Sequence, residues 1–257
     1  MNMLFVIDIG NTNITVGLYE GNRLKHTYRL TTKMKRTSDE YGFMMTNLMN
    51  DAGVVSSDVE DVIIASVVPK VMHSFRNCIR KYLHKEPIII GPGVRTGISV
   101  QMENPKAVGA DRIVDCAGAH YVYGGPALVV DVGTATTFDY VDENGGFSYG
   151  VIALGVESGA NALWSQTAQL PEVEIKSPGT ILTKNTSSNM QAGLFYGFLG
   201  QNEYIIRQFK KELGREDIKV IATGGIGKNI YRHNHPHAAN DRDITFKGLQ
   251  NHHEHVK

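Results

Sequence analysis

An internal repeat constrains the fold of this 257-residue chain more than any other feature. The segment Phe5–Asn13, with the sequence FVIDIGNTN, matches Leu128–Thr136, with the sequence LVVDVGTAT. In both, an apolar strand is followed by an aspartate, a β-branched residue, a glycine and mostly small hydroxyl or amide side chains. The two copies lie nearly half the chain apart, so a duplicated domain is the simplest interpretation. Chance similarity of two short strands is the alternative.

A second pair of segments supports the duplication. Val62–Pro69 and Lys219–Gly225 each read as a buried strand that ends in a turn, with Ala65 aligned to Ala222. This pair is further apart than the first, which predicts an inserted helix or loop in the second copy. We therefore predict domains at 1–117 and 118–257.

The pattern between the turns predicts alternating strands and helices. Thr37-Ser38-Asp39-Glu40 is a capping box that should begin a helix ending at Gly53. Other apolar stripes have helical spacing, and each repeated aspartate strand leads into a three-stranded meander. The stripes cover 71–83, 113–122 and 190–213, and the further meander strands cover 14–19, 24–30, 137–140 and 147–151. The predicted fold class is α/β, with mixed sheets flanked by helices.

Composition narrows the class of protein. Lys and Arg number 26, as do Asp and Glu, so no global positive field favours nucleic acid or an anionic membrane. The N-terminal segment, Met1–Ile9, reads as a strand rather than a signal peptide or membrane span. Cys78 and Cys116 occupy apolar helical positions, which predicts buried thiols in a reducing compartment. The terminal histidines could bind a transition metal adventitiously, but a frayed tail is the preferred interpretation; they are His252, His253 and His255.

The two aspartate turns are candidate phosphate sites. A tight turn of glycine and short polar residues lets backbone N–H groups approach a phosphate. Asp8 and Asp131 would repel a polyphosphate unless a cation lay between, so each implies Mg²⁺ or a monovalent ion. A structural hairpin is the alternative for one turn, but two copies favour a nucleotide clasp.

Other nucleotide-binding motifs fit less well. Gly224–Asn229 lacks the first glycine and the final Ser/Thr of a P-loop, and Gly91-Pro92-Gly93 opens no dinucleotide fingerprint. The Gly224-Gly225 pair suits either an adenosine packed against bare backbone or a plain turn.

A further candidate lies where the extended segment Glu103–Ala110 gives way to a helix. Asp111 and Arg112 should occupy the first turn of that helix. Arg112 offers a planar fork to a carboxylate-bearing substrate, and Asp111 can accept the proton of an attacking hydroxyl. The alternative is an aspartate that only stabilises the helix dipole.

Several motifs in order resemble the type III pantothenate kinases of bacteria. This family belongs to the superfamily of acetate and sugar kinases, heat-shock ATPases and actin, and the resemblance spans nearly the whole chain. Its carriers are Asp8-Ile9-Gly10-Asn11-Thr12, Gly91-Pro92-Gly93, Glu103-Asn104-Pro105, Gly109-Ala110-Asp111-Arg112, Asp131–Thr136, Lys184-Asn185-Thr186 and Ala222–Gly225. The resemblance implies duplicated ribonuclease H-like, or actin-like, domains.

The resemblance also implies an activity: ATP phosphorylates the terminal hydroxyl of pantothenate, the first committed step toward coenzyme A, in the cytoplasm. It makes Asp111 the proton acceptor and places K⁺ or NH₄⁺ on Asp131, and Mg²⁺ would accompany ATP at Asp8. Matching positions for ATP are Asp8, Ile9, Gly10, Asn11, Thr12, Asn13, Ile14, Thr15 and Thr134, and those for substrate are Gly109, Ala110, Asp111, Arg112 and Thr186.

Two further expectations come from the same resemblance. Family members are dimers with the substrate pocket near the subunit interface, so we expect a homodimer that binds neither nucleic acid nor membrane. The family tyrosine before the acidic-Asn-Pro motif is Met102 here. That departure keeps open a kinase for another hydroxy acid, and an ATP-binding regulator without transferase activity is the alternative from another class.

Overall fold

A computed structural model describes residues 2–32, 34–91, 93–225 and 238–256. Grouping by proximity divides the chain into two compact units. The first comprises the chain up to Val122, residues 145–147 and the residues from Asp243 onward. The second comprises Tyr123–Asn144 and Ser148–Arg242.

The first unit is built on a five-stranded mixed sheet. Its order is β3-β2-β1-β4-β5, with β1–β2–β3 antiparallel and β4 and β5 parallel to β1. The strands are β1 (Met3–Ile9), β2 (Asn13–Glu20), β3 (Arg23–Thr31), β4 (Val59–Ser66) and β5 (Ile88–Ile89). The predicted strand at the N-terminus and the meander that follows it are confirmed.

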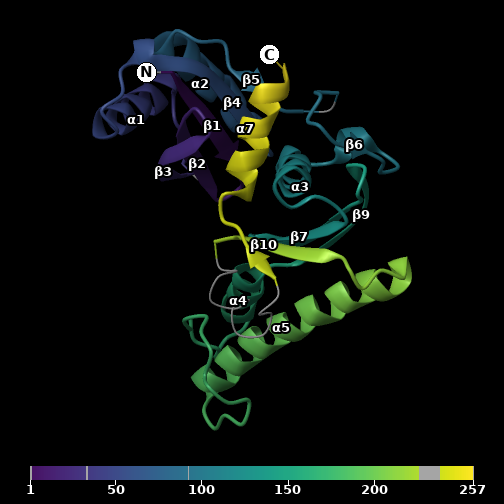
Figure 1. The fold of residues 1–257 in the computed structure, drawn as a ribbon. Coiled ribbons are helices and arrows are strands. Elements are labelled where there is room, and N and C mark those ends of the chain that lie inside the picture. Colours follow the sequence, from purple (N-terminus) through teal and green to yellow (C-terminus); the bar gives the residue numbers. More distant parts are fainter. Residues whose placement is uncertain (1, 33, 92, 226–237, 257) are drawn as a thin grey trace. The chain divides into compact units, whose positions relative to one another are not determined.

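Strand β1 is buried on both faces because helices cover each side of the sheet (Figure 1). On one face, Phe5 and Ile7 pack in a cluster that includes Tyr41 and Phe75. These come from α1 (Ser38–Asp51) and α2 (Pro69–Cys78), which a π-helical turn at Ile79–Leu83 extends. On the other face, Val6 packs with residues of α3 (Ala110–Tyr123) and α7 (Ile244–Val256). Burying each such side chain stabilises the fold by about 1.5–3 kcal/mol.

The capping box of α1 is confirmed. The Thr37 hydroxyl accepts from the Glu40 amide at 3.3 Å, and the Glu40 carboxylate accepts from the Thr37 amide at 2.7 Å. Two of the unpaired N–H groups that every helix start leaves are thereby satisfied. The helix ends at Asp51, shortly before Gly53, which has a positive φ of 66°.

The second sheet has the order β11-β10-β7-β8-β9-β6. One face of it packs on α4 (Val156–Ser165) and α5 (Thr186–Leu213) in a cluster that includes Val130, Phe138 and Phe195. The strands are β6 (Ser99–Val100), β7 (Ala127–Val132), β8 (Ala135–Val141), β9 (Gly146–Leu154), β10 (Lys219–Gly224) and β11 (Ala239–Asn240). The short β6 pairs with Gly146 and Phe147, the part of β9 grouped with the first unit.

The strand order confirms the predicted α/β fold with duplicated, ribonuclease H-like domains. The run β9-β8-β7-β10-β11 repeats β3-β2-β1-β4-β5. The pair β7–β8 is antiparallel like β1–β2, and β7–β10 and β10–β11 are parallel like β1–β4 and β4–β5. The predicted insertion in the second copy corresponds to α4 and the segment 166–185 that follows it. The predicted domains at 1–117 and 118–257 remain a prediction, and the compact units do not coincide with them, because α7 groups with the first unit.

The register corrects one detail of the sequence alignment. Asp8 pairs with Ala65 across β1 and β4, whereas Asp131 pairs with Thr223 across β7 and β10. Ala65 therefore corresponds to Thr223, and its alignment with Ala222 was wrong by one residue. Short apolar runs tolerate such a slip in sequence, but in a sheet it would turn every side chain to the opposite face.

The C-terminal histidines correct a second expectation. His252 and His253 lie within α7 and are buried, with relative exposures of 1% and 8%, so a frayed tail was wrong for them. The side chain of His255 lies outside the described residues. The prediction of buried thiols is confirmed for Cys78 and Cys116, and burial raises the pKa of Cys78 to about 12. Across the described part of the chain, no helix has the length and apolar character needed to cross a bilayer.

Candidate active site

The turn between β1 and β2 is tightly closed. The Gly10 amide donates to the Asn13 carbonyl at 2.9 Å, and the Thr32 amide donates to the Thr12 carbonyl at 3.0 Å. A Cβ at Gly10 would lie 3.3 Å from the Asn13 oxygen, which is closer than side chains normally come. Ile9 and Ile14 anchor the two ends of the turn in the core. Their expected contacts with ATP can therefore involve only their backbone.

Asp8 lies on the sheet face that α3 covers. Side chains alternate along a strand, so Asp8 shares its face with Leu4 and Val6. Those two residues pack in the same cluster as Ala110 and Val114 of α3. The carboxylate is half-buried and lies at the end of β1, where the phosphate-facing turn begins.

The start of α3 reaches the same end of the sheet through Val67. The Val67 amide, directly after β4, donates to the Ile9 carbonyl at 3.1 Å. The Val67 side chain in turn lies 3.4 Å from where a Cβ would stand on Gly109. The structure thus brings the Asp8 turn and the segment Gly109–Arg112 together at the carboxyl ends of β1 and β4, where ligands bind in open α/β sheets.

Asp111 occupies the first turn of α3, as predicted. Its Oδ1 accepts from the Arg112 amide at 2.8 Å and would lie 2.5 Å from a Cβ on Gly109, so a side chain there would push the carboxylate from this position. Burial raises the pKa of the Asp111 carboxyl, and the Arg112 amide and charge oppose this shift. A half-buried carboxylate with a raised pKa is a stronger base than an exposed one, as proton transfer at neutral pH requires.

Arg112 is also half-buried, with its guanidinium 5.6 Å from the centre of the Phe147 ring. Stacking on an aromatic face orients the planar guanidinium. Together with the N-terminal end of the α3 dipole, Arg112 makes this position favourable for an anionic group. The neighbouring Glu103, Asn104 and Pro105 are exposed.

The equivalent turn in the second unit joins β7 to β8. The Gly133 amide donates to the Ala135 carbonyl at 3.0 Å, and the Ser158 hydroxyl donates to the Thr134 carbonyl at 2.6 Å. Gly155, at the start of α4, packs directly on this turn, since a Cβ there would lie 2.4 Å from the Gly133 and Thr134 carbonyl oxygens. Helix α4 therefore holds the turn in place while Thr134 remains exposed.

Asp131 lies among oxygen-bearing residues that suit a hard cation. Its strand neighbours are Thr137 on β8 and Thr223 on β10. A Cβ at Gly224 would lie 2.7 Å from Asp131 Oδ1 and 2.3 Å from the Val132 carbonyl oxygen. A side chain at Gly224 would thus fill the space beside the carboxylate, and carboxylate, hydroxyl and carbonyl oxygens are the ligands that hard cations prefer.

The expected site residues fall into two groups. Asp8–Thr15 and Gly109–Arg112 belong to the first unit, whereas Asp131, Thr134 and Thr186 belong to the second. Thr186 is exposed at the start of α5, after Asn185, whose side chain caps that helix by accepting from the Ser188 amide at 3.0 Å. Pro92 and residues 226–229 of the glycine motifs lie outside the described residues.

Sequence reasoning missed the residues that support the second turn. Thr137 and Thr223 flank Asp131, while Gly155 and Ser158 hold Thr134. The repeat alone aligns Thr15 with Phe138, because the second turn is one residue shorter; only the registers, Asp8 with Thr15 and Asp131 with Thr137, show that the two threonines correspond. Gly155 and Ser158 follow a further strand, and nothing local in the sequence connects them to the turn.

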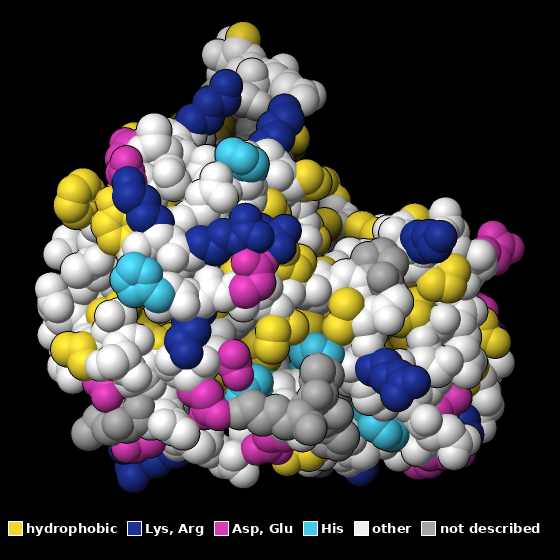
Figure 2. Space-filling model, turned by 90° about the horizontal axis from the view of Figure 1, so that it is seen from above, with side chains coloured by type: hydrophobic (Ala, Val, Ile, Leu, Met, Phe, Trp, Pro, Cys, Tyr) yellow, Lys and Arg dark blue, Asp and Glu magenta, His cyan; other side chains and the backbone are white. Residues whose placement is uncertain are grey.

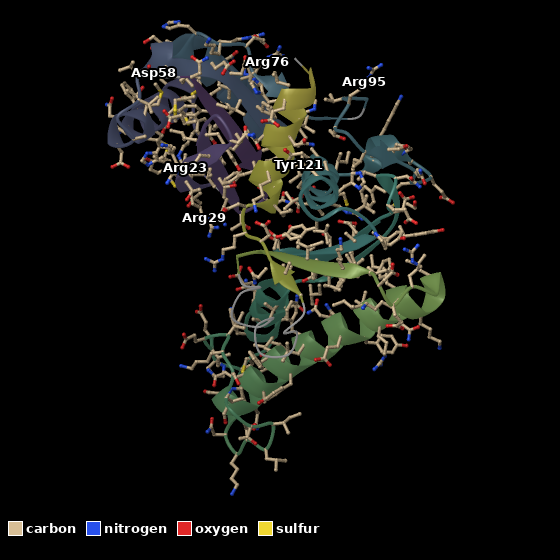
Figure 3. The ribbon with its side chains drawn as sticks, in the orientation of Figure 1. Arg23, Arg29, Asp58, Arg76, Arg95 and Tyr121 are labelled. Atoms are coloured by element: carbon tan, nitrogen blue, oxygen red, sulfur yellow. The ribbon has the colours of Figure 1, made fainter. Side chains whose placement is uncertain are left out.

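Surface charge is mixed on the face shown in Figure 2. The face shown in Figure 2 intersperses Lys and Arg side chains with Asp and Glu, in keeping with the equal totals. Arg23 and Arg29 are exposed on β3, and Tyr121 is exposed on α3 (Figure 3). Arg76 and Arg80 both pair with Glu86. These charged side chains either form ion pairs with near neighbours or are exposed to solvent. None of them is part of the Asp8 or Asp131 turn.

Comparison with known proteins agrees with the geometry. A model of the family "Type III pantothenate kinase" matches residues 4–208. A type III pantothenate kinase from Bifidobacterium longum (strain DJO10A) is 54% identical over 247 residues, covering 96% of each chain. Another, from Agathobacter rectalis, is 50% identical and covers 96% of this chain and 95% of its own.

A solved structure supports the fold alone. The activator of the 2-hydroxyisocaproyl-CoA dehydratase from Clostridium difficile, with bound ADPNP, has a TM-score of 0.55 at 11% identity. The match covers 97% of this chain and 92% of that one. The family model and the relatives above show that the chain belongs to the type III pantothenate kinase family and is a kinase.

Proposed function

We propose that the protein transfers the γ-phosphoryl group of ATP to the terminal hydroxyl of pantothenate, the first step of coenzyme A biosynthesis. The observation that carries this proposal is the half-buried Asp111, with its raised pKa, at the same end and on the same face of the first sheet as Asp8. The names of the family relatives support pantothenate as the acceptor. The ADPNP bound to the C. difficile activator supports a nucleotide on this fold.

Asp111 acts as the proton acceptor in this proposal. Its carboxylate takes the hydroxyl proton as the hydroxyl oxygen attacks the γ-phosphorus, and ADP leaves with the bridging oxygen. The Arg112 amide fixes the orientation of the Asp111 carboxylate through the bond to Oδ1. The Arg112 guanidinium binds the pantothenate carboxylate, with Gly109, Ala110 and Thr186 completing the substrate contacts.

The nucleotide contacts divide between the two turns. In the first unit, the backbone from Asp8 to Thr15 approaches the phosphates, with the closed Gly10–Asn13 turn at its centre. In the second unit, the exposed Thr134 offers a hydroxyl, and α4 holds its backbone through Ser158.

Two cations complete the proposal. Asp8 would hold Mg²⁺ with ATP, and Asp131 with Thr137 and Thr223 would hold K⁺ or NH₄⁺ in the space that Gly224 leaves open. Such ions supply positive charge that offsets the charge developing on the phosphoryl oxygens.

A homodimer in the cytoplasm is also proposed. Four large apolar side chains of β9 are exposed by 38–64%, and Leu163 of α4 by 38%; the β9 residues are Tyr149, Val151, Ile152 and Leu154. Side chains alternate along a strand, so Ile152 and Leu154 share one side of β9 and Tyr149 and Val151 the other. Exposed apolar residues of this size support a protein interface at β9. A second copy of the chain is the proposed occupant.

The experiment is a coupled ADP-release assay with pantothenate, with other hydroxy acids and without acceptor, each run with and without K⁺. We expect ADP release that depends on both pantothenate and K⁺. Turnover only with another hydroxy acid would assign a different acceptor, which Met102 makes worth testing. ATP binding without turnover on any acceptor would instead identify a regulator.

A further inference from the structure

A cluster of three metal-ligating side chains lies away from the proposed active site. Glu60 and Asp61 on β4 and His253 on α7 bring one ligand atom each within 4.8 Å of one another. His253 Nε2 lies 2.7 Å from Asp61 Oδ2. The cluster is at the amino end of β4, whereas Asp8 and Gly109 lie by its carboxyl end.

A β-bulge explains how neighbouring carboxylates reach one ligand cluster. Met3 pairs with Val59 and Leu4 pairs with Asp61, so Glu60 is an extra residue in β4. In a regular strand, consecutive side chains point to opposite faces. The bulge breaks that alternation and redirects a side chain, as bulges commonly do at functional positions. Asp61 shares its face with Leu4, which packs in the cluster that contains Phe246 and Leu249 of α7.

The third side chain is held firmly in position. His253 is only 8% exposed, and its helix is anchored beside it by Leu249, which is fully buried. The Asp61 side chain is 32% exposed, which leaves an approach from solvent. The cluster therefore combines one buried imidazole with two carboxylates at the protein surface.

We propose that Glu60, Asp61 and His253 bind a divalent transition metal, with Zn²⁺ as the favoured ion, that fastens α7 to β4. Imidazole and carboxylate ligands suit Zn²⁺, which lies about 2.0–2.2 Å from nitrogen and oxygen. Around a tetrahedral ion with these bond lengths, ligand atoms lie about 3.4 Å apart, so binding requires the three side chains to move from their present spacing of up to 4.8 Å. The Asp61–His253 hydrogen bond is the metal-free form of this arrangement.

The test is titration of the full-length protein with ZnCl₂ by isothermal calorimetry, with thermal unfolding of the same samples. We expect one Zn²⁺ bound per chain at this site and a rise in Tm with Zn²⁺, because an ion that binds only the folded state stabilises it. Glu60→Gln, Asp61→Asn and His253→Gln should each weaken this binding by about 10-fold or more.

Glu60→Gln is the most informative variant, because it removes a ligand and keeps the Asp61–His253 hydrogen bond intact. The matched control replaces His233, His235 and His237 by Gln, which removes other histidines of the same half of the chain. Circular dichroism checks that each variant is folded. Unchanged Zn²⁺ affinity in Glu60→Gln, or loss of all binding in the triple control, would overturn the proposal in favour of adventitious binding.

Discussion

At the scale of single residues, two aspartates in equivalent helix positions have opposite electrostatic surroundings. Asp111 lies in the first turn of α3, and burial raises its pKa. Asp39 lies in the first turn of α1, where hydrogen bonds from Lys81 and Tyr82 lower its pKa. The ionised form is therefore unfavourable in the folded state at Asp111 and favourable at Asp39.

Asp111→Asn should lower kcat by about 10²- to 10⁴-fold, the usual contribution of a general base, and leave ATP binding largely intact. The same change should raise Tm near neutral pH, because it removes a buried charge. In the unaltered protein, the ionised Asp111 lowers the free energy of unfolding. This effect is absent below the unfolded pKa of Asp111 and grows as pH rises through its raised folded pKa. Kinetics and nucleotide titration test the first effect, and thermal unfolding at about pH 3.5 and pH 7 tests the second, because the unfolded pKa of Asp is about 3.9.

Asp39→Asn is the matched control for an acid at a helix start. It should leave kcat unchanged and lower Tm near neutral pH, since the stabilisation by Asp39 is present above its unfolded pKa and is lost as pH falls through its lowered folded pKa. Near-normal activity in Asp111→Asn would leave Asp111 with only a helix-dipole role.

Gly224→Ala tests the cation site. Gly224 has a φ of 92°, and an added Cβ would approach Asp131 Oδ1 and the Val132 carbonyl. We expect a loss of about 1–3 kcal/mol of stability and loss of activation by K⁺. Gly225→Ala, where a Cβ would meet nothing within 4 Å, should change neither. Unfolding curves measure the change in stability, and activity assays with and without K⁺ measure the change in activation. A normal K⁺ response in Gly224→Ala would argue against the cation at Asp131.

At the scale of elements, α3 and α7 pack with their backbones in near contact. A Cβ on Gly118 would lie 2.4 Å from the Ile244 carbonyl, and one on Gly248 would lie 2.1 Å from the Val114 carbonyl. Glycine at both positions allows this approach. Thr245 adds a hydrogen bond of 2.6 Å to the buried Asp115. The position of α3, and with it Asp111, depends on this packing.

Gly248→Ala should therefore destabilise the protein by about 2 kcal/mol or more, since the clash is with backbone that cannot rotate away. Gly193→Ala on α5 is the control, because a Cβ there would meet nothing within 4 Å. Alanine is the better helix former by about 0.5–1 kcal/mol, so the control should be neutral or stabilising. Denaturant unfolding of both variants measures the difference, and equal stability would show that the helices separate at little cost.

Elements with local signals were predictable from the sequence, and those that depend on distant partners were not. The Thr37–Glu40 capping box and the meander after Asp8 need only neighbouring residues. The bulge at Glu60 and the burial of His253 depend on packing between segments 192 residues apart in sequence. The start of α3 was predicted from its residues, but its closeness to the Asp8 turn depends on Val67, which no motif singled out.

At the scale of the whole molecule, the repeat explains why both sheets carry an aspartate beside a glycine turn, and the structure shows how the copies differ. Asp8 has Ala65 beside it on β4, whereas Asp131 has Thr223 on β10. The second aspartate therefore has one more neighbouring hydroxyl group than the first. This difference suits Mg²⁺ with phosphate at the first turn and a monovalent ion at the second.

Ile152→Glu tests the proposed homodimer. Ile152 is 64% exposed in β9, and a buried, unpaired charge at a subunit interface is strongly unfavourable. We expect a dimer for the unaltered protein and a monomer for the variant by analytical ultracentrifugation. Phe43→Glu, an equally exposed apolar position on α1, should remain a dimer. A dimeric Ile152→Glu protein would exclude the side of β9 that carries Ile152 as the interface.

Helix α7 belongs to the first unit although it follows the entire second unit in sequence. During synthesis, one face of the first sheet therefore lacks Phe246 and Leu249 until the ribosome has made the entire second unit. The second unit has all of its strands from β7 to β11 before α7 emerges. The first unit is thus begun before the second and completed after it, and the part of its apolar face that α7 covers lacks that helix until then.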